Sequence, residues 1–131
     1  MQEPSIFTRI INGEIYAPKI YEDDRVIAFL DIHPLCEGHT LVVPKIQVDH
    51  LWDLPDDDYE YLWKVTKNIA NHIKEVYNSP RVGSVVEGFG VPHAHVHLLP
   101  IYQGDDLRRI PNHDNAPDME WLEQVAARLR M

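Results

Sequence analysis

The sequence has a single cysteine, Cys36, among its 131 residues. One cysteine cannot close a disulfide within the chain, which argues against a small disulfide-stapled secreted domain and fits a reducing compartment. No apolar run approaches the ~20 residues of a membrane-spanning helix, and no signal-peptide pattern opens the chain. The sequence also has no internal repeat and no low-complexity tract. We therefore expect a cytoplasmic protein without a membrane partner.

Positive charge is also scarce. Twelve Lys and Arg residues stand against 21 Asp and Glu residues, which gives a net charge of −9. A chain this acidic is a poor partner for nucleic acid, because binding to that backbone depends on basic side chains. A small anionic ligand is still compatible with this charge, since one pocket can be locally positive. The length and the 44% hydrophobic content predict one globular domain over residues 1–131.

Hydrophobic periodicity predicts the order of helices and strands. The longest helix is expected over residues 56–78, where Leu62, Val65, Ile69 and Ile73 recur every three or four positions. Short links between most strands favour antiparallel pairing, so we predict an α+β fold with a largely antiparallel five-stranded sheet and helices packed on it. The other expected elements are a helix capped by Ser5 and ended by Gly13, strands at residues 17–21, 26–31, 40–44, 82–87 and 91–100, and a last helix with Pro117 at its first position.

Three histidines alternate with apolar residues in the strand expected at residues 91–100. Side chains two apart share one face of a strand, so His93, His95 and His97 would line one face. Three interpretations compete: exposed histidines on an edge strand, a metal site, or catalysis by one histidine whose neighbours orient it and handle protons. One zinc ion would strain to reach all three, because His93 and His97 would lie about 13 Å apart along the strand. Two of the three could chelate a metal.

Residues 93–99, His-Ala-His-Val-His-Leu-Leu, resemble the signature of the histidine-triad (HIT) family of nucleotide hydrolases and transferases. The resemblance extends upstream through residues 5–15 and 21–32. It covers about residues 1–100 and leaves residues 101–131 as a C-terminal loop and helix. It implies a HIT-like fold whose strands pair across a dimer.

The resemblance also implies a reaction at the α-phosphate of a nucleoside phosphoramidate or a dinucleoside polyphosphate. His95 would be the nucleophile and would form a nucleotidyl-histidine intermediate that water resolves. His93 and His97 would donate to the phosphate oxygens, and His39 would hold the imidazole array. The ligand would be a purine nucleotide or nucleotide conjugate, and the reaction would need no cofactor. The alternatives are a nucleotide-binding regulatory or adaptor protein with little turnover, and a hydrolase that uses a metal held by two triad histidines.

The substrate-binding residues follow from the same resemblance. Asp31 would hold the ribose hydroxyls, although an aspartate before Pro34 is also a common turn cap. Phe89 and Gly90 stand where many relatives have Gln and Ser, and they are the expected neighbours of the phosphate. Their lack of polar side chains slightly favours the adaptor alternative. The expected wall around the base, whose members would also fit plain core packing, consists of Ile6, Phe7, Ile10, Phe29 and Ile32.

Many relatives of this kind carry a structural zinc. Its ligands are two cysteines three residues apart, a later histidine and one triad histidine. Here the matching positions hold Ser5, Thr8 and Gln47. Hydroxyls and an amide are poor zinc ligands beside thiolate and imidazole, so we predict that no structural zinc is bound.

We also expect a homodimer. The helix over residues 56–78 carries Tyr61, Trp63 and Tyr77 in addition to its core stripe, which is more apolar surface than one small domain usually hides. In the resembling family, this helix and a strand join two copies through one continuous sheet. The alternative is that these aromatic side chains pack under the C-terminal segment.

Overall fold

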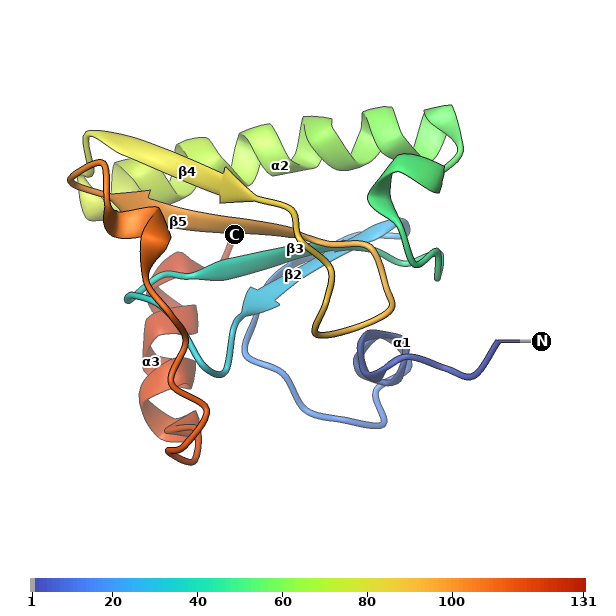
Figure 1. The fold of residues 1–131 in the computed structure, drawn as a ribbon, viewed down its shortest axis with the longest axis horizontal. Helices are drawn as coiled ribbons and strands as arrows, with labels where there is room; N and C mark the ends of the chain where they lie inside the picture. Colours follow the sequence, from blue (N-terminus) through green and yellow to red (C-terminus); the bar gives the residue numbers. More distant parts are fainter. Residues whose placement is uncertain (1) are drawn as a thin grey trace.

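The structure of the protein is a computed structural model that describes residues 2–131 (Figure 1). Five strands form an antiparallel sheet in the order β1-β2-β3-β5-β4, so β1 and β4 are its edges. The predicted α+β class with a five-stranded antiparallel sheet is therefore confirmed. The strands are β1 (Lys19–Glu22), β2 (Val26–Leu30), β3 (Thr40–Pro44), β4 (Arg81–Val85) and β5 (Val96–Ile101).

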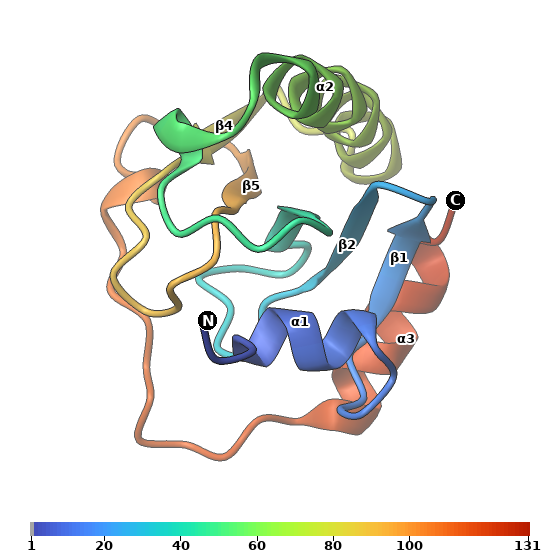
Figure 2. The ribbon, with the colours of Figure 1, turned by 90° about the vertical axis from the view of Figure 1, so that its right-hand side faces the viewer.

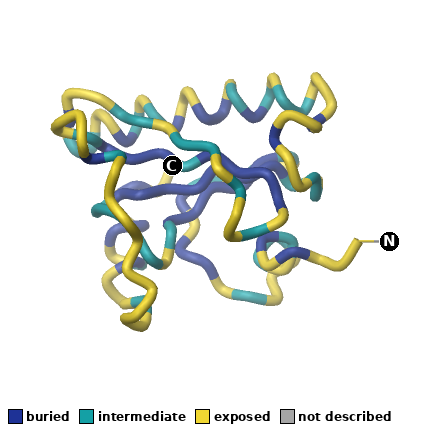
Figure 3. The backbone as a smooth tube through the Cα atoms, in the orientation of Figure 1, coloured by how far each residue is buried: buried dark blue, intermediate teal, exposed yellow. Residues whose placement is uncertain are grey.

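The helices lie on both faces of this sheet (Figure 2). On β2, Ala28 points into the hydrophobic cluster beneath α2 and α3, whereas Phe29 points the other way and packs against Phe7 of α1. Figure 3 shows the central strands as deeply buried, and every residue of β2 and β3 is buried. The helices are α1 (Ile6–Ile11), α2 (Asp56–Tyr77) and α3 (Met119–Leu129), with short 3-10 turns η1 (Leu51–Asp53) and η2 (Asp106–Arg108).

The long helix α2 follows the predicted periodicity. Leu62, Ile69 and Ile73 are completely buried, as the three- and four-residue spacing requires. Asn78 ends the helix in the left-handed conformation with φ +48°, which asparagine tolerates better than most residues. At 22 residues α2 is long, yet no helix within residues 2–131 is both long enough and apolar enough to cross a membrane.

The strand predicted across all three triad histidines is wrong in its first half. β5 begins at Val96, so His93 and His95 precede the strand and only His97 lies in it. Pro92 has no amide hydrogen to give to a sheet ladder. The N–H of His93 then turns back to the carbonyl two residues earlier, at 2.8 Å. The three imidazoles therefore do not share one face of a strand.

The last helix begins later than predicted. The sequence predicts Pro117 at its first position, but α3 begins at Met119 with Asp118 as its N-cap. The Asp118 carboxylate accepts a hydrogen bond from the Trp121 N–H at 3.1 Å. A carboxylate that satisfies a free N–H sets the helix start more strongly than a proline, which only tolerates the first position.

Candidate active site

A backbone carbonyl holds the imidazole of His95 in one tautomer. Its Nδ1 lies 2.7 Å from the carbonyl oxygen of His93. A carbonyl only accepts hydrogen bonds, so Nδ1 carries a proton, and in the neutral ring Nε2 keeps its lone pair. Within residues 2–131 nothing hydrogen-bonds to this Nε2, and only 5% of the residue is exposed. A neutral imidazole with a free, unprotonated nitrogen is the form that attacks an electrophile.

His39 and His97 form a second ordered set of hydrogen bonds. The Leu35 N–H donates to His39 Nδ1 at 3.1 Å. His39 therefore carries its proton on Nε2 and donates it to His97 Nδ1, 2.9 Å away. The proton of His97 must then sit on Nε2, which is buried and has no partner among the described residues. The ring centroids of His97 and His95 are 5.0 Å apart. The free N–H of His97 and the free lone pair of His95 therefore lie on neighbouring rings.

Burial keeps these imidazoles neutral near pH 7. Burial, with smaller contributions from His95 and His39, lowers the pKa of His97 to about 4. Burial also lowers the pKa of His39 below its ordinary value, although Asp31 acts in the opposite direction. Only neutral rings can keep the order of donors and acceptors described above, because an imidazolium donates from both nitrogens. The site therefore offers directed N–H groups rather than fixed positive charge.

His93 lies apart from this pair and has no free ring nitrogen. The residue is completely buried, and its Nε2 donates to the Pro44 carbonyl oxygen at 2.7 Å. Its Nδ1 lies 2.7 Å from the Ser5 hydroxyl. Both nitrogens are thus used within the protein, so the direct phosphate contact expected for His93 does not fit this geometry. What His93 supplies to the site is the carbonyl that holds His95.

Asp31 follows directly after β2, and its two carboxylate oxygens differ in surroundings. Oδ1 accepts from the His33 N–H at 2.8 Å, which is the turn-capping role considered from the sequence. Oδ2 lies 3.7 Å from His39 Nε2, and the side chain is 21% exposed. One oxygen therefore holds the turn while the other keeps its capacity to accept a hydrogen bond from a ligand. The two sequence interpretations of Asp31 are compatible.

Of the residues expected to form the wall around the base, some lie in the core and others lie at the surface. Phe7 and Phe29 are buried with their ring centroids 5.4 Å apart, and the Phe7 ring meets the His95 ring edge-on at 5.0 Å. Core packing alone accounts for both phenylalanines. Ile6 and Ile32 are 47% and 40% exposed, so they are the wall residues with apolar surface to offer a ligand.

The remaining expected contacts lie at the margin of the site. Ile10 is half-buried against the cluster that contains Phe7. Phe89 and Gly90 lie between β4 and the triad, and 93% of Phe89 is exposed. The Phe89 ring therefore packs against little of the protein, and the structure does not bring it onto the histidines.

Comparison with known proteins identifies the family. The family model of the HIT domain matches residues 12–104. This chain belongs to the HIT family. An uncharacterized HIT-like protein of Methanocaldococcus jannaschii is 43% identical over 104 residues, which cover 76% of this chain and 81% of that protein. An adenosine 5'-monophosphoramidase of Saccharomyces cerevisiae is 36% identical over 96 residues, which cover 72% and 61% of the two chains.

Solved structures of HIT proteins share the fold over nearly the whole chain. A HIT-like protein from Bartonella henselae, described as involved in cell-cycle regulation, matches with a TM-score of 0.85 at 32% identity over 98% of this chain and 96% of that one. A zinc-bound histidine triad family protein from Mycobacterium smegmatis matches with a TM-score of 0.79 at 28% identity, over 95% and 89%. The family resemblance stated from the sequence is thereby confirmed.

One set of side chains in the HIT site has the composition of a metal site. Asp31, His39 and His97 each place one ligand atom within 4.8 Å of the others. A metal bound by both histidines would need a lone pair on the ligand nitrogen of each ring. His39 Nε2 instead carries a proton, which it donates to His97 Nδ1. Binding would therefore cost this hydrogen bond and the proton that makes it. This set differs from the pair of triad histidines considered from the sequence.

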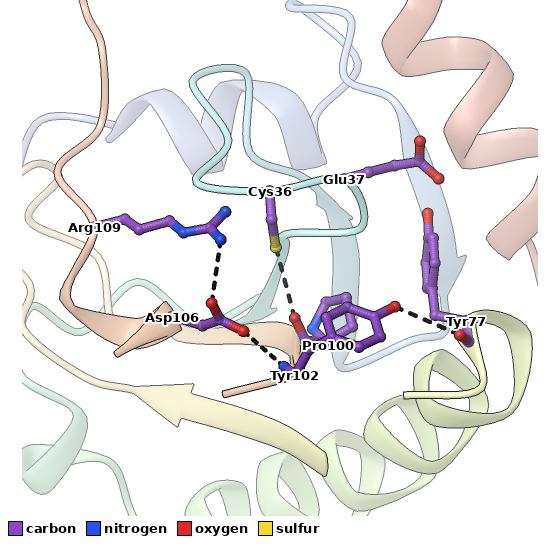
Figure 4. Close-up of a pocket in the computed structure, with 7 residues that line it drawn as sticks. All are labelled: Cys36, Glu37, Tyr77, Pro100, Tyr102, Asp106 and Arg109. Carbon is purple, nitrogen blue, oxygen red and sulfur yellow. Dashed lines mark hydrogen bonds and ion pairs between the residues drawn. The ribbon is translucent and has the colours of Figure 1, made fainter. Parts of the chain in front are cut away.

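A cavity of about 320 Å³ lies beside the loop that carries His39 (Figure 4). Arg109 reaches into it and donates to the Leu35 carbonyl at 3.2 Å and to Asp106 at 3.1 Å. Because the N–H of Leu35 donates to His39, a single residue, Leu35, links Arg109 of the C-terminal loop to the histidine pair. No sequence motif includes Arg109, so only the structure reveals this connection. The cavity is lined by Cys36, Glu37, Tyr77, Pro100, Tyr102, Asp106 and Arg109.

Proposed function

We propose that this HIT protein is a nucleotide hydrolase or transferase that acts at the α-phosphate of a nucleoside phosphoramidate or dinucleoside polyphosphate. The observation that carries the proposal is the unprotonated, unpaired Nε2 of His95 beside the free Nε2–H of His97. The relative named as an adenosine 5'-monophosphoramidase supports this class of reaction. A purine nucleotide conjugate is the proposed ligand.

The proposed reaction has two displacements at phosphorus. The lone pair of His95 Nε2 forms a bond to the α-phosphorus, and the bond from phosphorus to the leaving group breaks. The leaving group departs with that electron pair and takes a proton from water. A second water then attacks phosphorus and gives a proton to the hydroxide left by the first water, while the P–Nε2 bond breaks and its electron pair returns to Nε2. His95 ends in the tautomer in which it began.

The neighbouring groups would stabilise the charge that develops during these steps. The Nε2–H of His97 would donate to a non-bridging phosphate oxygen, which satisfies a donor that is otherwise buried without a partner. Asp31 Oδ2 would accept from a ribose hydroxyl, while the exposed faces of Ile6 and Ile32 would contact the base. In this arrangement the histidines carry out the chemistry, and other residues provide most of the nucleotide binding.

A second candidate function is nucleotide binding without appreciable turnover. The observation that favours it is the pair Phe89 and Gly90, because neither side chain can hydrogen-bond to a phosphate or leaving group. A third candidate, metal-assisted hydrolysis, rests on the Asp31, His39 and His97 set. Both alternatives predict a different result in one assay.

Purified protein given adenosine 5'-phosphoramidate is expected to turn it over equally well with and without a chelator. The reason is that the nucleophile and the phosphate donor are both imidazole nitrogens. Protein purified without added zinc should also carry well below one equivalent of the metal. Turnover lost with the chelator would favour the metal-assisted reaction, and nucleotide binding measured by calorimetry without turnover would favour the binding protein.

We also propose that the protein is a homodimer joined through β4 and α2. β4 is an edge strand, so backbone groups on its outer side are available to a second copy. Trp63 Nε1 on α2 is buried without a partner among the described residues. For Tyr77 the alternative of packing against the C-terminal segment applies, since Arg128 of α3 lies 5.4 Å from its ring centroid. Light scattering at micromolar concentration should give twice the chain mass, and a monomeric mass would overturn the dimer.

A further inference from the structure

We propose that Ser5, Thr8 and Gln47 form a metal-free clamp on His93, and that Ser5 is thereby a positioning residue for His95. The inference rests on the proposed role of His95 as nucleophile. These side chains stand where zinc-binding relatives are expected to hold their metal. Two hydroxyls and an amide do not fit a structural zinc, because thiolate and imidazole are its preferred ligands. The structure assigns them a different task, which is to hold His93 by hydrogen bonds.

The hydrogen-bond directions identify Ser5 as the residue that donates to His93. The Thr8 hydroxyl gives its single proton to Gln47 Oε1 at 2.6 Å, so it has none for His93 Nδ1 at 3.4 Å. The Ser5 hydroxyl accepts from the Thr8 N–H at 3.0 Å as the N-cap of α1. Its own proton has two acceptors within reach, Thr8 Oγ1 at 3.3 Å and His93 Nδ1 at 2.7 Å, and the shorter distance assigns it to His93.

The opposite side of the His93 ring fixes its tautomer. Nε2 donates to the Pro44 carbonyl at 2.7 Å, so Nδ1 must present its lone pair to Ser5. A metal ligand at this position would need the same lone pair in the same direction. The Ser5 hydroxyl thus takes the place that a metal would otherwise occupy. His93 is completely buried and Ser5 is 5% exposed, so water has little access to substitute for either partner.

Gln47 links the clamp to the chain through both its side-chain oxygen and its side-chain nitrogen. Its Oε1 accepts from the Ser5 N–H at 2.9 Å as well as from the Thr8 hydroxyl. Its Nε2 donates to the Glu3 carbonyl at 2.8 Å. The start of α1 is therefore fastened to the segment after β3 through one amide side chain. This fastening keeps the Ser5 hydroxyl in line with the His93 ring.

The clamp reaches the nucleophile through the backbone of His93. Residues 93–95 precede β5, so the sheet ladder does not hold the His93 carbonyl that accepts from His95 Nδ1. The backbone on either side is held by the His93 N–H, which donates to the Val91 carbonyl at 2.8 Å, and by the Ala94 N–H, which donates to the Val48 carbonyl at 2.7 Å. The ring of His93, anchored at Ser5 and Pro44, adds the side-chain contacts that set the position of its carbonyl. Loosening the ring would let the carbonyl move and let the proton of His95 shift to Nε2. His95 would then lose its attacking lone pair, with nucleotide binding unaffected.

The test compares Ser5→Gly with Ser5→Thr in the full-length protein. Glycine is a tolerable N-cap, so Ser5→Gly removes the hydroxyl with little loss of the helix start. We expect kcat to fall about 10-fold or more with KM within about twofold, which is the scale of loss seen when the hydrogen-bond partner that orients a metal-bound histidine is removed. Threonine keeps the hydroxyl and should restore kcat to within about threefold of the original protein. A Ser5→Gly variant with unchanged kcat would overturn the inference.

Nitrogen NMR of the histidine rings gives a readout that does not depend on turnover. The original protein should show His95 protonated at Nδ1 alone, and Ser5→Gly should show a mixture of both tautomers. An unchanged His95 spectrum in Ser5→Gly would overturn the clamp even if activity fell. If the original protein turns over no nucleotide conjugate, the proposed function fails, while the same spectra still decide whether Ser5 holds the tautomer.

Discussion

Replacing His95 by alanine is expected to lower kcat by several powers of ten and to leave nucleotide binding largely intact. His95 is the triad residue whose free Nε2 lone pair can form the bond to phosphorus. Loss of a covalent nucleophile elsewhere costs up to about a millionfold in kcat. Binding should change little, because Asp31 and the exposed faces of Ile6 and Ile32 do not depend on this imidazole.

Asp31→Ala provides the matched contrast. It removes the carboxylate proposed to hold the ribose but leaves both neighbouring imidazoles, so KM should rise more than kcat falls. The exposed His50, whose side chain is 73% accessible, serves as a neutral control when changed to alanine. Brief mixing with labelled substrate and a quench that avoids acid should leave label on His95. If His95→Ala keeps more than about a tenth of the activity, the nucleophile is another group.

The second large effect is a loss of stability on acidification from about pH 6.5 to pH 4. Burial lowers the pKa of His97 to about 4, and it lowers the pKa of His39 and of His93 as well. In the unfolded chain a histidine titrates near its ordinary value of about 6.5. Between these values the unfolded state binds more protons than the folded state, so the free energy of unfolding decreases as the pH falls.

Part of this loss of stability can be assigned to His97. The shift at His97 corresponds to stability on the order of 2 to 3 kcal/mol, allowing for its partial exposure, which is present above about pH 6.5 and lost toward pH 4. Urea unfolding at several pH values would measure it. His97→Gln removes one titrating group and should flatten the pH dependence, and His50→Gln at an exposed side chain is the control for the substitution itself. Equal slopes for the original protein and His97→Gln would contradict the prediction.

The triad residues of the site could be predicted from the sequence because they form a short motif. The spacing of His93, His95 and His97 identifies the family, and the periodicity of α2 and the short strand links predict the sheet and its covering helices. Side-chain identity also rules out good zinc ligands at Ser5 and Thr8. These inferences need only local patterns or residue types, which do not depend on how distant segments meet.

Strand boundaries near the site were harder to predict from the sequence, for a physical reason. Alternation of His with apolar residues predicts a strand through His93, but Pro92 cannot donate to a sheet ladder, and the next N–H turns back on its own segment. The pattern reports which side chains are apolar and carries no information about where backbone hydrogen bonds go. β5 consequently begins at Val96, after two of the three triad residues.

The sequence by itself therefore determined the family, the α+β class and His95 as the central residue of the triad, because each depends on residue identity and spacing. Only the tertiary structure decided the proton positions and the role of His93. Ser5 is separated from His93 by 88 positions, and His39 from His97 by 58, yet each pair shares a hydrogen bond. A tautomer is set by whichever donor or acceptor faces each nitrogen. Which group faces it depends on how α1, β3 and β5 pack together.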